Sequence, residues 1–89
     1  MGREIEFAKS LSGHDKNQIY LVKEKDEKFV YLVNGTTKSL DAPKRKSRKH
    51  IQEIRRLPQE VLDALNGTWS DTAVKRAVKL YQCRNQEDL

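Results

Sequence analysis

Hydrophobic and polar residues follow a period of two along the first half of the chain. Ile5 and Phe7 alternate with charged neighbours, and the runs QIYLV (18–22) and KFVYLV (28–33) are apolar and rich in β-branched and aromatic residues. The segment KEKDEK (23–28) joins these runs with charges of alternating sign. The pattern predicts three short strands, with a solvated charged loop between the second and the third.

An Asn-Gly pair at 34–35 follows the third predicted strand and precedes TTKSL (36–40). Because Asn and Gly tolerate positive φ, this pair predicts a two-residue type I′ hairpin and a tightly paired fourth strand. The segment KHIQEI (49–54) predicts a fifth strand with Ile51 or Ile54 facing inward. The first half should therefore form a compact five-stranded unit.

The second half changes to a helical period. Pro58 suits the first position of a short helix, and the Asn-Gly pair at 66–67 suits its end. A second helix is predicted with Ser70 as N-cap and with Trp69 packing on Val74. Its apolar positions Val74, Ala77, Val78 and Tyr81 fall on one side, and Lys75, Arg76 and Lys79 fall on the other. We expect the two helices to form a hairpin that packs on the strands.

Composition and charge bound the class of protein. The chain has 89 residues, which is enough for one small domain, and 35% of them are charged. The stretch Lys44–Arg56 holds seven basic residues against Glu53 alone, a net of +6, which leaves the rest at −1 of the total of +5. A localised positive field of this kind is typical of proteins that bind phosphate groups or acidic surfaces.

The residues give little support to catalysis, metal binding or membrane insertion. Cys83 is the only cysteine, and the two histidines, His14 and His50, belong to no catalytic or metal-binding motif. The N-terminal residues contain no apolar signal region, and no window is apolar enough for a membrane helix. We expect a cytoplasmic, non-enzymatic protein with no catalytic residues, no metal and no cofactor.

Two segments are candidates for ligand contact. The first is the basic run KRKSRK (44–49), predicted to be a loop that Pro43 stiffens between two strands. The second is the polar loop KSLSGHDKNQ (9–18), with Gly13 at its turn. The candidate donors are Lys44, Arg45, Lys46, Arg48 and Lys49 in the run, and Lys9, Ser12, His14, Lys16 and Asn17 in the polar loop. The alternatives for the run are a solvated loop and a nuclear localisation signal.

The stretches FAKSLSGHDKNQIYLV (7–22) and LDAPKRKSRKHI (40–51) resemble the KOW-type RNA-binding module. The likeness is greatest to small bacterial KOW-domain proteins related to a large-subunit ribosomal protein family of archaea and eukaryotes. It implies an SH3-like five-stranded β-barrel over residues 1–57, followed by a helical C-terminal extension over 58–89. It also implicates these residues in RNA contact: Ser12, Gly13, His14 and Lys16 in the first loop, and Lys44, Arg45, Lys46, Lys49 and His50 in the second.

Two positions of the first loop need separate treatment. Asp15 is expected to shape the turn rather than to contact RNA. Asn17 stands where the family pattern has glycine. Since Asn is among the non-glycine residues that best adopt positive φ, we expect the turn to survive with a side chain added.

The predicted function is RNA binding, with ribosomal RNA of the large subunit or a ribosome-associated complex as the expected partner. RNA is favoured over DNA because the predicted fold offers no long element to fill a major groove. Phe7, Tyr20, Phe29 and Tyr31 lie in strand patterns and are assigned to the core. The alternatives are a protein-interaction module of the transcription or translation machinery and DNA binding by the same patch, and the oligomeric state stays open.

Overall fold

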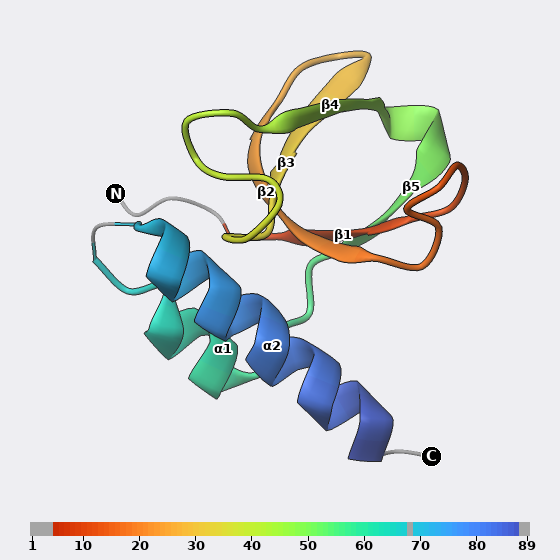
Figure 1. Ribbon diagram of the computed structural model, residues 1–89. Coiled ribbons are helices and arrows are strands. Elements are labelled where there is room, and N and C mark those ends of the chain that lie inside the picture. Colours follow the sequence, from red (N-terminus) through yellow and green to blue (C-terminus); the bar gives the residue numbers. More distant parts are fainter. Residues whose placement is uncertain (1–4, 68, 88–89) are drawn as a thin grey trace.

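The computed structural model describes residues 5–67 and 69–87, which form one curled antiparallel sheet and two helices (Figure 1). The strands are β1 (Phe7–Ser10), β2 (Ile19–Lys25), β3 (Phe29–Val33), β4 (Lys44–Ser47) and β5 (Ile51–Ile54), with a 3₁₀ turn at Arg48–His50; the helices are α1 (Gln59–Ala64) and α2 (Asp71–Glu87). The order across the sheet is β4-β3-β2-β1-β5. The prediction of a mainly β protein with a helical appendage is confirmed.

The sheet is not a closed barrel, so that part of the fold prediction is wrong. β4 and β5 are its two edges, and within the described residues no ladder pairs them. The 3₁₀ turn carries the chain from one edge to the other, and β4 and β5 have only four residues each. Arg48 of this turn forms an ion pair with Glu53 of β5, with Arg48 Nη2 3.5 Å from Glu53 Oε1.

Both faces of the sheet are apolar, which explains the continuous hydrophobic run of β2. Ile19 and Leu21 face the helices, whereas Tyr20 and Val22 face the inside of the curl. The inner cluster consists of Ala8, Tyr20, Val22, Val30, Leu32 and Ile51. The outer cluster joins Phe7, Ile19, Leu21 and Val33 of the sheet to Val61, Leu65, Val74, Ala77 and Val78 of the helices.

The helices pack together beneath β1 and β2, as Figure 1 shows. Ser70 Oγ accepts a hydrogen bond from the amide of Ala73 at 3.1 Å, so the predicted N-cap is confirmed. Tyr81 of α2 meets Phe7 of β1 edge-to-face, with ring centroids 5.5 Å apart. The segments 1–57 and 58–89 thus share one core. Neither described helix has the length and apolar character needed to cross a membrane.

The predicted hairpin after β3 is wrong. Residues 36–40 form no strand, and Asn34 is not in the positive-φ region that a type I′ turn requires. Asn34 instead uses its side chain, whose Oδ1 accepts bonds from the amides of Thr36 and Lys38 at 2.9 Å each. Gly35 has φ +79° and lies against α2, where an added Cβ would collide with Asp71 O and come within 2.6 Å of Lys75 N.

The prediction of a loop over residues 23–28 is also wrong in part, because its first three residues belong to β2. β2 continues to Lys25 through an irregularity in its pairing with β3, between the pairs Val22↔Leu32 and Glu24↔Tyr31. The extra residue, Lys23, turns the following side chains to the opposite faces. Lys25 therefore points into the curl.

Candidate nucleic-acid interface

The basic run predicted as a loop is largely the edge strand β4. It pairs with β3, and this register sets where its cations point: Lys44 lies opposite Leu32 and Lys46 opposite Val30, whose side chains are buried inside the curl. Lys44 and Lys46 therefore point inward. Arg45, between them, points outward.

Lys44 and Lys46 both contact Asp15, which lies in the loop between β1 and β2. We call this loop, residues 11–18, the first loop. Lys46 Nζ lies 2.8 Å from Asp15 Oδ1, and Lys44 Nζ lies 2.8 Å from Oδ2. The same carboxylate accepts a hydrogen bond from Ser10 Oγ at 2.9 Å and one from the Tyr20 hydroxyl at 3.0 Å. These five residues, the Asp15 cluster, close one end of the inner apolar cluster.

The pKa values of Asp15 and Tyr20 follow from this cluster. Burial acts to raise the pKa of Asp15, but the hydrogen bonds from Lys44, Lys46, Ser10 and Tyr20 outweigh it and hold that pKa well below its usual range. Burial, together with the hydrogen bond and the charge of Asp15, raises the pKa of Tyr20 to about 12. Asp15 is therefore an ionised structural anchor at neutral pH.

The first loop has a defined backbone. The Asn17 amide donates to Ser10 O at 2.8 Å, and the Gln18 amide donates to Asp15 O at 2.9 Å. Asn17 has φ +73°, so the prediction that asparagine adopts positive φ in this turn is confirmed. Gly13 has φ +87°. The loop is held from both ends and presents its remaining side chains outward.

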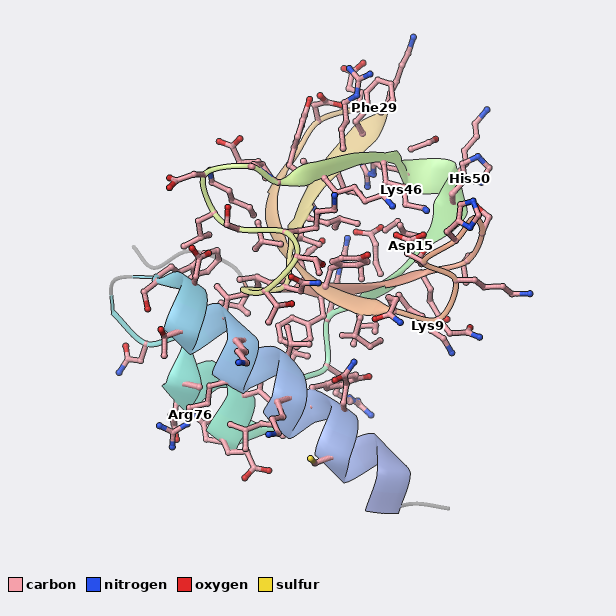
Figure 2. All side chains as sticks on the ribbon, in the orientation of Figure 1. Lys9, Asp15, Phe29, Lys46, His50 and Arg76 are labelled. Atoms are coloured by element: carbon pink, nitrogen blue, oxygen red, sulfur yellow. The ribbon has the colours of Figure 1, made fainter. Side chains whose placement is uncertain are left out.

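The first loop and the 3₁₀ turn lie side by side, joined by a hydrogen bond from the Leu11 amide to His50 O at 2.9 Å. This places one exposed surface at a single end of the sheet, formed by His14, Lys16, Asn17, Lys49 and His50, which we call the basic end. In Figure 2, Asp15 and His50 mark this region, with Lys9 at its rim. Within the described residues, Lys9, Lys16 and Lys49 have no carboxylate partner within ion-pair distance.

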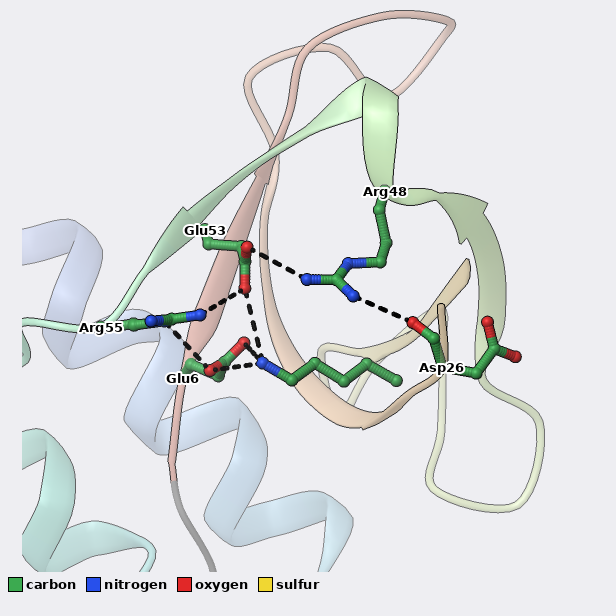
Figure 3. Close-up of polar contacts among 6 residues, drawn as sticks. Glu6, Asp26, Arg48, Glu53 and Arg55 are labelled. Carbon is green, nitrogen blue, oxygen red and sulfur yellow. Dashed lines mark hydrogen bonds and ion pairs between the residues drawn. The ribbon is translucent and has the colours of Figure 1, made fainter. Parts of the chain in front are cut away.

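A second ionic cluster joins the residue before β1 to side chains of β2, β5 and the 3₁₀ turn, and continues to Arg55 just after β5 (Figure 3). Glu6 is only 4% exposed, and its two carboxylate oxygens each lie 3.1 Å from Lys25 Nζ. Glu53 is 3.5 Å from Lys25 and, on its other oxygen, 3.5 Å from Arg48. Arg55 pairs with Glu6 and Glu53 at 3.5 and 3.3 Å. These residues are the Glu6 cluster.

The predicted contact residues thus divide into three groups. His14, Lys16, Asn17, Lys49 and His50 come together at the basic end, with Lys9 and Gly13 beside them. Lys44, Lys46 and Arg48 are held in ionic clusters, and the carbonyl of Ser12 accepts a hydrogen bond from Lys46 Nζ at 2.9 Å. Arg45 projects from the outer face of β4 instead.

The ionic clusters contain residues that the sequence analysis did not single out. Glu6 was missed, although it directly precedes β1 and stands two and four residues before Ala8 and Ser10, a spacing that puts all three on the same face of an extended chain. Each cluster also keeps a net charge of +1, because two lysines face Asp15, and three cations face Glu6 and Glu53. The clusters therefore add to the positive field of the exposed lysines.

No protein-family model matches the chain, and no curated protein matches its sequence. In the described part of the chain, no group of three His, Cys, Asp or Glu side chains is placed to hold a metal ion. The candidate surface is therefore characterised by its own geometry, which is a short set of exposed basic residues beside the ion pairs of the Asp15 cluster.

Proposed function

We propose that the protein binds RNA without catalysis, and that the basic end contacts the phosphate backbone. The observation that carries this proposal is the hydrogen bond between Leu11 and His50, which joins two separate segments into one surface of a single charge sign. Lys16 and Lys49 stand on this surface without carboxylate partners, so a polyanion would relieve their mutual repulsion. The backbone of the first loop is fixed by its hydrogen bonds, which lowers the entropy cost of binding.

The binding should depend on salt and only weakly on sequence. Lys9, Lys16 and Lys49 provide about three phosphate contacts, for which the log–log slope of affinity against salt concentration is roughly −2 to −3. The surface is short and compact and offers no helix to lie in a DNA major groove, which favours recognition of RNA shape and backbone.

We further propose that the fold is an SH3-like module of KOW type acting on the large ribosomal subunit in the cytoplasm. The order β5-β1-β2-β3-β4 and the position of the first loop beside the segment before β5 support this assignment. The KOW resemblance places RNA contacts in these same two segments. The open edge between β4 and β5 marks the difference from a closed barrel.

The first test is fluorescence anisotropy with a short labelled RNA stem-loop and rising KCl. The double variant Lys16→Gln/Lys49→Gln should weaken binding at least tenfold and flatten the salt slope. The matched control Lys75→Gln/Lys79→Gln removes the same charge from exposed positions of α2 and should bind almost as the wild type does. Equal losses in the two variants would contradict a localised site.

The same assay separates the alternatives. Competition by a DNA duplex as effective as that by RNA would favour DNA binding, and a partner protein that stays bound at high salt would favour an interaction module. Sedimentation of the tagged protein in cell lysate through a sucrose gradient tests whether the protein associates with the ribosome. Co-migration with the large subunit that Lys16→Gln/Lys49→Gln abolishes is the expected result, and wild-type protein that stays at the top of the gradient would remove the ribosomal part of the proposal.

A further inference from the structure

The outer face of β3 and β4 carries two aromatic rings and a guanidinium group that the core does not use. Phe29 and Tyr31 are half-buried on this face, although their strand pattern assigned them to the core. Arg45 is exposed, lies directly opposite Tyr31 in the ladder, and holds its Cζ atom 4.7 Å from the centroid of the Phe29 ring. We call Phe29, Tyr31 and Arg45 the stacking face.

The geometry of Arg45 fits a flat, uncharged ligand better than a phosphate. One side of its guanidinium is directed at the Phe29 ring, and a planar guanidinium stacks on aromatic systems as well as forming ion pairs. Arg45 makes no ion pair with any described carboxylate. Its exposed side can therefore receive a second planar group.

The carboxylates around the stacking face also favour an uncharged ligand over a phosphate. Glu24 lies opposite Tyr31 on β2, and Asp26 Oδ2 accepts a hydrogen bond from the Tyr31 hydroxyl at 3.4 Å. These carboxylates would repel a phosphate, whereas a nucleobase is neutral and carries amino groups that can donate hydrogen bonds to a carboxylate. Asp26 also accepts bonds from the amides of Lys28 and Phe29 at 2.9 and 2.8 Å, so the turn beneath the rings is fixed.

The stacking face is continuous with the basic end. The Arg48 amide donates to Lys28 O at 2.9 Å, which ties the turn before Phe29 to the 3₁₀ turn that carries Lys49 and His50. Arg45 and Lys49 are four residues apart, so at most about 14 Å of chain separates them. A short single strand of RNA can therefore reach both surfaces at once.

We propose that the stacking face binds an unpaired nucleobase of the RNA whose phosphates lie on the basic end. This inference rests on the proposed function and adds to it the class of ligand, namely RNA with at least one unstacked base. Stacking on aromatic rings and guanidinium planes is the usual way in which proteins hold such bases. The two surfaces then have separate roles, since the lysines hold the backbone and the stacking face holds the base.

The test compares two single-stranded probes of equal length, an oligoadenylate and an abasic ribose-phosphate strand, against two conservative variants. Phe29→Leu keeps an apolar side chain, and Arg45→Lys keeps the charge while removing the planar group. Each should weaken oligoadenylate binding about 5- to 100-fold. Neither should change binding of the abasic strand by more than about twofold or alter the salt slope. Arg76→Lys on α2 is the matched control, and thermal unfolding followed by circular dichroism confirms the fold of each variant.

The outcomes separate this inference from the proposed function. A loss confined to oligoadenylate supports the stacking face. Variants that bind oligoadenylate as the wild type does, or that lose affinity for both probes equally, overturn it. The proposed function still stands in those cases if Lys16→Gln/Lys49→Gln weakens binding of both probes. Wild-type protein that binds neither these strands nor the stem-loop would overturn both proposals together.

Discussion

Lys46 Nζ lies 2.8 Å from Asp15 Oδ1, and the side chain of each residue is only 11% exposed. The ion pair joins β4 to a loop 31 residues earlier in the chain. Lys44 binds the other oxygen of the same carboxylate. Two cations of the most basic stretch of the sequence therefore hold the first loop against the edge of the sheet, beside the surface proposed to contact RNA.

Replacing Asp15 with Asn should lower the free energy of unfolding by about 2–4 kcal/mol. The amide keeps the shape of the side chain but leaves two lysines, one of them almost fully covered, without a negative partner. Urea unfolding measures the effect. Asp41→Asn is the control, because Asp41 is exposed and should change stability by less than about 0.5 kcal/mol. Similar losses in the two variants would contradict the anchoring role.

The stabilisation by Asp15 should disappear in acid. Its pKa in the folded protein is held well below the value of about 3.9 for an unfolded aspartate, so protonation favours the unfolded chain. The stabilisation is complete above about pH 5 and declines as the pH falls below about 4. The difference in unfolding free energy between wild type and Asp15→Asn should therefore be constant from neutral pH down to about 5 and then shrink. A difference that stays constant in acid would refute this assignment.

Tyr20 should ionise late. Its folded pKa of about 12 exceeds the ordinary value of 10.0, so the stability that it contributes is complete below about pH 10 and is lost as the pH rises towards 12. Alkaline titration followed by phenolate absorbance, with Tyr20→Phe subtracted, isolates this group. In Asp15→Asn the same ionisation should move to lower pH, since the hydrogen bond to a charged acceptor is gone. If Tyr20 ionised at the same pH in Asp15→Asn as in the wild type, burial alone would account for its raised pKa.

Gly35→Ala should destabilise the protein by about 2–4 kcal/mol, because the new Cβ meets both a positive φ and the backbone of α2. Gly67→Ala is an informative comparison. Gly67 also has a positive φ, at +98°, but a Cβ there would find open space, so only the backbone cost of about 1 kcal/mol is expected. Thermal or urea unfolding of the two variants separates steric conflict from backbone strain, and equal effects would exclude the conflict with α2.

Local signals in the sequence predicted local structure well. The apolar stripe of α2, the Ser70 cap and the runs of β2 and β3 depend on residues close together in the chain, and each prediction is confirmed. β4 was missed because alternating lysine and arginine residues have no strand pattern of their own. In the folded protein they pair with β3, and Asp15 forms ion pairs with the two inward lysines, Lys44 and Lys46.

The remaining errors have the same origin in distant contacts. The Asn-Gly pair at 34–35 carries a hairpin signal, yet Gly35 is positioned by its close approach to α2. The basic end was only partly predicted, because the sequence does not reveal that Leu11 bonds to His50. The separation of outward from inward cations also depends on the pairing of β4 with β3.

The shared outer cluster of sheet and helices has a consequence for cooperativity. Phe7, Leu21 and Val33 share the outer cluster with Val61, Val74 and Val78 of the helical hairpin, so detaching the hairpin would expose apolar side chains of the sheet to water. Trp69, whose Nε1 donates to Leu65 O at 3.0 Å, reports on the hairpin by its fluorescence. That signal and the circular dichroism of the sheet should share one melting midpoint, as in a single two-state unit. A fragment ending at residue 57 would be left with a water-exposed apolar surface and a strong tendency to self-associate.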